Sequence, residues 1–466
     1  MSTPSSCSCL NASTSRVSWI DDACADAVAL AGLQPDRTAW VAVCAPVPLP
    51  ESPIELFTAA AGLGRSLLWQ PASDTQQSEW LLGLGAAADL AADGPGRTLW
   101  LTRESARVEA RLVTRSPVPG APALPAWLAA WSFEELPAKP GHWGTRLPAA
   151  RLVLPRRLLW RQADRGWEIL ATQVAADEDP GTVAERLVGT LPHVPVNAPT
   201  PWPRLSIDYA EQVDDAISLI ADGMMRKVVL ARAVDEAVHA DQVTMLTRLA
   251  AAPGATVYAH DLDDGALFLG ATPEQLFAIS GTQVTTMALA GSSRRGENEA
   301  EDLALVGELM ASTKQRKEHN LVVEHLSVQL KHRCLPFAIP NTPHHRLAAN
   351  LIHLETRIQA ELLRPDYLDL LNAVHPTPAV CGLPTVTAAH YITRHEHLHR
   401  GLYAGVLGWM TADACRLIVP LRGGILHPDG VRARLFAGAG IVETSDPQTE
   451  LQETELKLGP MRRVIS

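Results

Sequence analysis

Three residues near the end of the chain have the types and spacing for metal or substrate chemistry. Glu450, Glu453 and Lys457 follow Asp446 and Pro447, a pair that commonly starts a helix. At spacings of three and four residues, the three side chains lie on one helical face. An ordinary surface Glu–Lys pair, contributing about 0.3 kcal/mol, has the same spacing.

Lys227, Glu274 and Glu318 are further candidates for chemistry. Lys227 opens the segment KVVLARAV, whose β-branched residues predict a strand. An amine at the mouth of a buried strand is desolvated, which suits a general base, although a lysine at a strand end can also extend to solvent. Glu274 lies in a turn between two predicted strands, and Glu318 lies within a long predicted helix. On their own, both carboxylates are also typical of a protein surface.

Two other patterns suggest different chemistry. HEHLH at 395–399 places His395 and His399 at i and i+4, as zinc proteases do, but no third ligand follows at a suitable spacing. The glycine-containing segments match neither the Walker pattern nor GxGxxG, so dinucleotide binding is not supported. We therefore expect a loop of solvated histidines and glycines that serve turns.

Length, charge and cysteine usage limit the class of protein. The 466 residues are 47% hydrophobic, with a net charge of −11 and no cluster of Lys and Arg, which argues against nucleic-acid binding. The first 30 residues lack a basic region followed by an apolar run, and no uncharged apolar run reaches ~18 residues. We expect neither a signal peptide nor a membrane span. Seven scattered cysteines without CxxC indicate a reduced, cytoplasmic protein.

The elements that must position these residues follow a proline-rich break at 191–204, where we place the main boundary between 1–204 and 205–466. Before it, helical patterns alternate with short apolar runs such as Trp40–Cys44 and Thr98–Leu101. Residues 115–157, rich in Pro, Trp and Ala, predict an irregular connection. After it, we expect helices opening at Ser206–Asp208, near Gln242–Ala251, and from Asn298 to Arg333, with short strands between and after them. This mixture predicts an α+β fold, an α/β sandwich.

Eight segments between about residues 205 and 462 together resemble chorismate-utilising enzymes, including anthranilate synthase component I. In chain order they are RKVVLAR (226–232), FLGATPE (268–274), LAGSSRRG (289–296), KQRKEHNLVV (314–323), HPTPAVCGLP (375–384), RGLYAGVLGW (400–409), VPLRGG (419–424) and GAGIVETSDPQTELQETELK (438–457). The resemblance implies two large, mostly antiparallel sheets packed together with flanking helices. Residues 1–204 match the family poorly and would complete the same sandwich.

The resemblance also implies a reaction. Members that use ammonia carry Gln where this chain has Lys227, whereas members that use water carry Lys. It therefore implies that Lys227 activates water for attack at carbon 2 of chorismate, and that Glu274 protonates the hydroxyl leaving carbon 4. Mg²⁺ is the implied cofactor, with Glu318, Glu450 and Glu453 as its ligands.

Substrate contacts are implied in the same way. Arg422 and Tyr403 resemble the residues that hold the enolpyruvyl carboxylate, a task suited to a planar donor fork. The remaining implied contacts are Gly291, Ser292, His353, Gly438 and Lys457, with His353 near the bond that lyases break. One departure is Gln315, where many members carry an acidic residue, so one outer carboxylate of the metal site is missing.

The implied activity is the reversible isomerisation of chorismate to isochorismate. Salicylate synthase, which makes the same intermediate and then eliminates pyruvate, is the alternative; Ser292 and Thr356 favour the first activity. A silent chorismate-binding regulator is disfavoured because Lys227 and Glu274 are both retained. We expect a monomer that uses no amidotransferase subunit, nucleic acid or membrane. The downstream pathway, to a quinone, a siderophore or salicylate, is left open.

Overall fold

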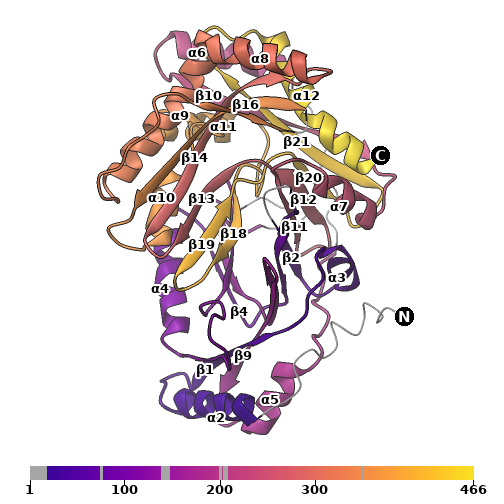
Figure 1. Cartoon of the computed structure of the whole chain (residues 1–466), viewed down its shortest axis with the longest axis vertical. Helices are drawn as coiled ribbons and strands as arrows, with labels where there is room; N and C mark the ends of the chain where they lie inside the picture. The colour runs from indigo at the N-terminus through magenta and orange to yellow at the C-terminus, as the bar shows by residue number, and fades with distance from the viewer. Residues whose placement is uncertain (1–17, 74–76, 138–146, 199–201, 203–207, 349) are drawn as a thin grey trace.

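Two large β-sheets form the centre of the molecule, with helices on their outer faces and at both ends (Figure 1). The computed structural model describes residues 18–73, 77–137, 147–198, 202, 208–348 and 350–466. Its helices are α2 (Ser18–Gly32), α3 (Ile54–Ala59), α4 (Arg97–Glu109), α5 (Pro180–Val188), α6 (Tyr209–Ala221), α7 (Gln242–Ala250), α8 (Glu299–Ala311), α9 (Thr313–Lys331), α10 (Tyr367–Val374), α11 (Thr385–His395) and α12 (Pro447–Ile465).

The described strands form one sheet of 12 and one of 9. The order in the first is β17 (Gly382–Leu383), β10 (Lys227–Ala237), β21 (Arg432–Ile441), β20 (Gly423–Leu426), β12 (Leu267–Thr272), β11 (Thr256–Asp261), β2 (Arg65–Gln70), β3 (Glu79–Leu84), β8 (Arg157–Gln162), β9 (Arg165–Ala175), β1 (Thr38–Pro46) and β5 (Leu112–Arg115). The order in the second is β15 (His344–Leu347), β16 (Leu351–Glu361), β14 (Gln283–Arg294), β13 (Gln275–Ser280), β19 (Ala414–Ile418), β18 (Val406–Met410), β6 (Trp127–Trp131), β7 (Ala150–Leu154) and β4 (Ala88–Ala92).

Both sheets are almost entirely antiparallel, and both contain strands from either side of residue 204. Strand β11 pairs with β2 in the first sheet, and β18 pairs with β6 in the second. Only β1 and β5 pair in parallel among the described strands. The predicted α+β sandwich of two large antiparallel sheets with flanking helices is confirmed.

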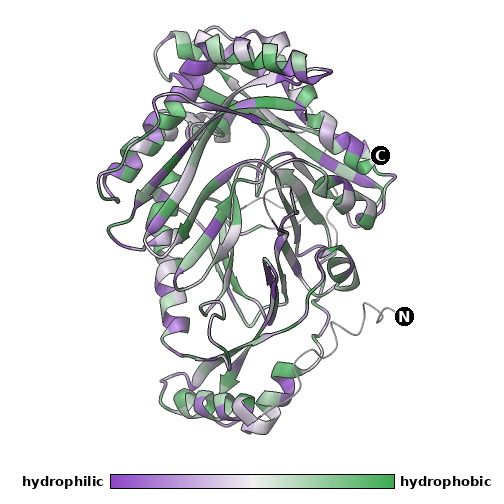
Figure 2. Ribbon diagram, viewed as in Figure 1, coloured by the Kyte–Doolittle hydropathy of each residue, from purple (hydrophilic) through white to green (hydrophobic). Residues whose placement is uncertain are grey.

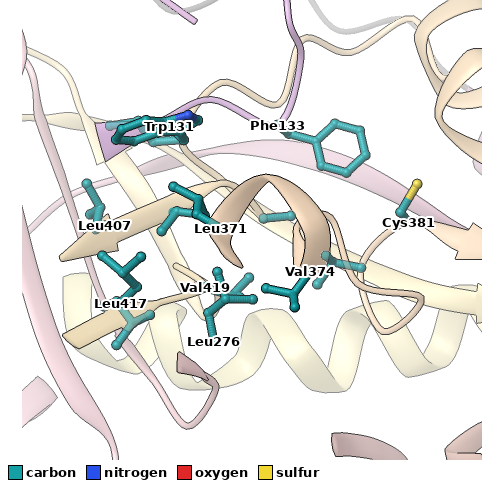
Figure 3. Packing of buried hydrophobic residues seen from close by; sticks show 14 of the residues in the cluster. Trp131, Phe133, Leu276, Leu371, Val374, Cys381, Leu407, Leu417 and Val419 are labelled. Carbon is teal, nitrogen blue, oxygen red and sulfur yellow. The ribbon is translucent and has the colours of Figure 1, made fainter. Parts of the chain in front are cut away.

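Large apolar side chains fill the space between the second sheet and helix α10 (Figure 3). Figure 3 shows Trp131 of β6, Leu407 of β18 and Leu417 of β19 packed near Leu371 and Val374 of α10. Figure 2 shows hydrophobic colour concentrated on the strands and mixed colours on the flanking helices. This distribution follows from burial, since each apolar side chain removed from water contributes about 1.5–3 kcal/mol. None of the described helices is both long and apolar enough to cross a membrane.

Two local predictions from the sequence were wrong. Residues 115–157 contain strands β6 and β7 and the start of β8. The helix expected over Asn298–Arg333 is two helices, α8 and α9, separated at Ser312, whose ψ of 113° is extended. The expected helix start at Ser206 lies outside the described residues, but Asp208 caps α6 by accepting from the amides of Ala210 and Glu211.

Candidate active site

Lys227 begins β10 and is completely buried. Its ammonium donates to Oε1 of Glu318 on α9, with 2.8 Å between Nζ and the oxygen. The backbone beside this pair comes from Gly440 of β21. A Cβ on Gly440 would lie 2.6 Å from Oε1 of Glu318 and 3.0 Å from Cε of Lys227. A side chain at position 440 would therefore displace the ion pair that the strand passes.

Glu274 is held by the turn that joins β12 to β13. Its amide donates to Oγ1 of Thr272 at 3.2 Å, and the Thr272 hydroxyl donates to the carbonyl of Val419 at 2.6 Å. The Val419 amide in turn donates to the carbonyl of Glu274 at 3.1 Å. This closed set of bonds fixes the backbone, so the carboxyl group points from a rigid support.

The protonation of Glu274 suits a general acid near neutral pH. Burial raises its pKa from 4.5 to about 7, although the positive charges of Lys227, Arg422 and Lys457 act in the opposite direction. A carboxyl with a pKa near the working pH holds a proton and can also release it. Lys227, Arg422 and Lys457 therefore lie close enough to Glu274 for their charges to lower its pKa.

Arg422 presents an unsatisfied guanidinium to this site. Its Nη2 lies 3.5 Å from Nε2 of His353, and its Nη1 is buried without a hydrogen-bond partner among the described residues. Its backbone φ is +52°, a conformation that non-glycine residues rarely adopt and that is often stored at functional sites. Burial lowers the pKa of Arg422. A buried donor without a partner is costly, so this group is placed to receive an anion.

His353 is a neutral side chain between Arg422 and Ser292. Its Nδ1 lies 2.8 Å from Oγ of Ser292, which comes from the neighbouring strand β14. Burial lowers the pKa of His353 well below its ordinary value, and the charges of Arg422 and Lys457 lower it further. The imidazole is therefore uncharged at neutral pH and can offer hydrogen bonds.

Gln315 supports the glycine turn beside Ser292. Its Oε1 accepts from the amide of Ser292 at 2.9 Å. Gly291 has a φ of +79°, and a Cβ there would lie 3.1 Å from the carbonyl oxygen of Gln315. The residue that departs from the family pattern thus has a positioning role that the sequence did not suggest.

The carboxylates expected to bind metal each accept from a lysine. Besides the Lys227–Glu318 pair, Nζ of Lys457 lies 2.5 Å from Oε1 of Glu453, and Nζ of Lys314 lies 3.4 Å from Oε1 of Glu450. Ser445 also donates to Oε1 of Glu450 at 2.7 Å. Helix α12 carries Glu450, Glu453 and Lys457 on one face, as their spacing predicts.

The three carboxylates influence one another without forming a ready cluster. Burial raises the pKa of Glu450, and the nearby charges of Glu453 and Glu318 raise it further. Burial acts to raise the pKa of Glu453 as well, but Lys457, Arg422 and Lys314 hold it below its ordinary value. Within the described ranges, no three His, Cys, Asp or Glu side chains meet closely enough to hold a metal ion as they stand.

Tyr403 and Gly438 line a small inner cavity of about 60 Å³ together with Arg422 and Lys457. The Tyr403 ring stacks on Phe436 with centroids 5.2 Å apart, and burial raises its pKa to about 12. The Gly438 carbonyl accepts from Nζ of Lys457 at 2.9 Å. The Tyr403 phenol therefore stays protonated and can donate beside Arg422.

The HEHLH segment has a structural role instead of a metal site. Glu396 is fully buried and binds Arg400, whose guanidinium also donates to the carbonyls of Val229 and Val380 at 2.7 Å. His395 stacks on Tyr391 with centroids 4.6 Å apart. His395 and His397 are exposed, as expected, although His395 ends helix α11 and Glu396 between them is buried. Arg400, which the sequence did not single out, ties the strand of Lys227 to the segment before β17.

A family model described as chorismate binding enzyme matches residues 33–466. The chain belongs to the chorismate-binding enzyme family. This match extends far upstream of residue 205, into strands that carry none of the motifs. The upstream strands thus belong to the part of the chain that matches the family, although they carry none of the quoted motifs.

Named relatives of this chorismate-binding enzyme are isochorismate synthases. The salicylate biosynthesis isochorismate synthase of Pseudomonas aeruginosa is 40% identical over 263 residues, covering 55% of this chain and 54% of that protein. Isochorismate synthase DhbC of Bacillus subtilis is 32% identical over 332 residues, covering 69% of this chain and 78% of its own. The match thus spans about half of the Pseudomonas protein.

The fold is also found in solved structures. MenF, the menaquinone-specific isochorismate synthase from Escherichia coli, superposes with a TM-score of 0.72 at 23% identity. The superposition covers 96% of this chain and 99% of MenF. The N-terminal strands therefore belong to the architecture that the two chains share.

Proposed function

We propose that this chorismate-binding enzyme is an isochorismate synthase, which converts chorismate reversibly to isochorismate with Mg²⁺. One observation carries the proposal: Glu274, with a pKa of about 7, is buried within the field of Lys227. A proton donor and an amine in one closed site are what addition of water and loss of hydroxyl require. Relatives named as isochorismate synthases in Pseudomonas aeruginosa and Bacillus subtilis support the same activity.

The two residues divide the reaction between them. Once Lys227 has released the proton that it donates to Glu318, it takes a proton from water while the water oxygen bonds to carbon 2 of chorismate. The ring double bonds shift, the bond from carbon 4 to oxygen breaks, and Glu274 gives its proton to the departing hydroxyl. One water enters and one leaves, so the product is an isomer. In the reverse direction Glu274 acts as the base and Lys227 as the acid.

The remaining predicted site residues bind and orient chorismate. Arg422 has a buried Nη1 without a partner in the described structure, and Tyr403 keeps its phenol proton beside it. We assign these two donors to the enolpyruvyl carboxylate. Lys457, Gly438, Gly291 and Ser292 line the remaining approach. Ser292 holds the neutral His353 ring near the ether bond of chorismate, the bond that lyases break.

The donors on α9 and α12 suit Mg²⁺. Glu318, Glu450 and Glu453 supply hard oxygen ligands, and Mg²⁺ usually keeps several waters while binding only one or two carboxylates. A preassembled cluster of three is thus not needed, and the mutual influence of Glu450, Glu453 and Glu318 indicates that they lie near one another. When bound, the ion would neutralise a substrate carboxylate and polarise it.

We further propose that the enzyme acts as a cytoplasmic monomer without an amidotransferase subunit. The cysteines that the structure describes are all buried and free, in keeping with a reducing compartment. Lys227 in place of glutamine argues against the use of ammonia. Size-exclusion chromatography coupled to light scattering would test the oligomeric state.

Incubation of the purified protein with chorismate and Mg²⁺, followed by chromatographic separation, tests the activity. We expect isochorismate in equilibrium with chorismate, and none with Lys227→Gln. Salicylate and pyruvate at neutral pH would favour salicylate synthase instead. Unchanged chorismate would refute both activities.

A further inference from the structure

A second cavity lies beside the active site, and none of the described residues that line it is acidic. It has a volume of about 370 Å³ and is bounded by the end of α7, the Pro273 turn, Asn350, and the last turns of α12. We call it the outer cavity. Volumes of roughly 300–1,000 Å³ are typical of small-molecule sites. Its size therefore suits a ligand with a single ring.

The lining of the outer cavity combines apolar surface with positive charge. Leu249, Ala271, Met461 and Val464 are buried residues that contribute apolar atoms. The charged residues in the lining are Arg248, Arg422 and Arg463. The chain carries 51 acidic against 40 basic residues, so three arginines with no carboxylate among the described lining residues form a local reversal of charge. Such a surface recognises an anion attached to an apolar ring.

None of these arginines forms an ion pair within the described part of the chain. The Nη1 of Arg248 donates to the carbonyls of Arg463 and Val464 at 3.2 and 3.1 Å. These bonds hold the Arg248 guanidinium against α12 but leave its charge uncompensated. Among the described residues, the exposed Arg463 guanidinium has no hydrogen-bonding partner, and Nη1 of Arg422 has none either.

The outer cavity adjoins the inner cavity, and the two share a lining residue. Arg422 borders both the outer cavity and the inner cavity beside Tyr403. Pro273 in the outer lining immediately precedes Glu274, and Met461 follows Lys457 by about one turn of α12. The inner cavity, about 60 Å³, is much smaller than the outer cavity of about 370 Å³. The outer cavity therefore offers more room for a ring near Arg422.

We propose that the outer cavity is a second binding site, for a six-membered-ring carboxylate, on the approach to Glu274. The proposal rests on the proposed function, because chorismate and the aromatic acids made from its products share this chemistry. Arg463 and Arg248 attract the carboxylate before it reaches Arg422. The apolar walls hold the ring. The active site offers an anion less net attraction than the outer cavity, because each of its three glutamates Glu318, Glu450 and Glu453 is already paired with a lysine.

Binding of benzoate to the metal-free full-length protein tests the site directly. Benzoate has the ring and the carboxylate but no group that can react. We expect two variants to bind benzoate roughly tenfold or more weakly in calorimetry: the single variant Arg463→Gln and the double variant Arg248→Gln with Arg463→Gln. The reason is that charge-assisted hydrogen bonds to the benzoate carboxylate are lost. Arg364→Gln removes one exposed charge elsewhere and serves as the matched control. Melting temperatures of all variants verify folding.

Kinetics with chorismate and Mg²⁺ provide a second measurement. In Arg463→Gln, kcat/KM should fall about three- to tenfold and depend less on salt, because rim charges act mainly on association. Benzoate should inhibit wild-type enzyme, and its inhibition should weaken in the same variant. If Arg463→Gln loses benzoate inhibition but keeps a normal kcat/KM, the site binds aromatic acids alone. If benzoate inhibition is lost and kcat/KM also falls, the site binds the substrate as well.

Two results would overturn the proposal. One is equal benzoate affinity in Arg463→Gln and Arg364→Gln. The other is an affinity that falls in Tyr403→Phe, which alters only the inner cavity, but not in Arg463→Gln. If wild-type protein failed to convert chorismate but still bound benzoate through Arg463, the proposed activity would be wrong and the second site would stand.

Discussion

Replacing Glu274 with Gln is expected to stabilise the protein at pH 8 while removing its activity. Burial raises the pKa of Glu274 to about 7 from an ordinary value of 4.5. The unfolded chain loses this proton near pH 4.5, whereas the folded protein keeps it until about pH 7. The folded state is therefore progressively destabilised as pH rises through this interval. The difference corresponds to roughly 3 kcal/mol, at about 1.4 kcal/mol per tenfold change in proton affinity.

Glutamine keeps the shape of the protonated acid and cannot ionise. At pH 8, Glu274→Gln should therefore raise the free energy of unfolding by up to about 3 kcal/mol, and at pH 4.5 the pH-dependent gain should vanish. For 466 residues the unfolding entropy is about 1 kcal/mol/K, so the melting temperature should rise by roughly 3 °C at pH 8. Turnover should fall about 10²–10⁴-fold because the proton donor is lost.

Urea denaturation of wild type and variant at pH 5 and pH 8 measures this difference. Glu168→Gln is the matched control, because Glu168 is equally buried but lies 3.2 Å from Arg157. Removing one partner of a buried ion pair should destabilise at both pH values. A gain for Glu274→Gln that is the same at pH 5 and pH 8, or a loss at pH 8, would refute the assignment of a buried neutral acid.

Three further substitutions test other parts of the site. Lys227→Gln should abolish conversion of chorismate while changing chorismate affinity, measured by calorimetry, less than about tenfold; wild-type turnover would disprove its role as base. Gly440→Ala should lower both melting temperature and activity, because its Cβ would lie 2.6 Å from Glu318, whereas Gly459→Ala has 3.7 Å of clearance and should be tolerated. Glu453→Ala should raise the Mg²⁺ concentration needed for half-maximal turnover, and full activity in chelator would contradict the metal assignment.

The sequence was most informative where side-chain chemistry and local spacing coincide. Asp446 caps α12 as expected, accepting from the Thr449 amide at 2.9 Å, and the helix then presents Glu450, Glu453 and Lys457 together. A helix with a period of 3.6 residues makes that arrangement predictable. The neighbours of Glu274 were not predictable in this way. Lys227 and Arg422 approach it only because distant strands share a sheet.

The local errors have identifiable physical causes. Strand β6, with the sequence WLAAW, is buried on most of its length, so it shows no alternation of polar and apolar residues. The break between α8 and α9 has neither Pro nor Gly. A signal was nevertheless present, because Ser312 and Gln315 have the spacing of a capping box, and Ser312 Oγ accepts from the Gln315 amide at 3.3 Å.

Helix α12 explains how one element can serve both cavities. Its carboxylates Glu450 and Glu453 lie near the N-terminus, Lys457 lies near the middle, and Arg463 lies in the last turn. This order of charge is also the one that the helix dipole stabilises. With a rise of 1.5 Å per residue, Arg463 lies about 9 Å beyond Lys457 along the axis. An anion entering past Arg463 therefore meets Lys457 before it meets the carboxylates, so the stability of the helix and the direction of approach require the same sequence of charges.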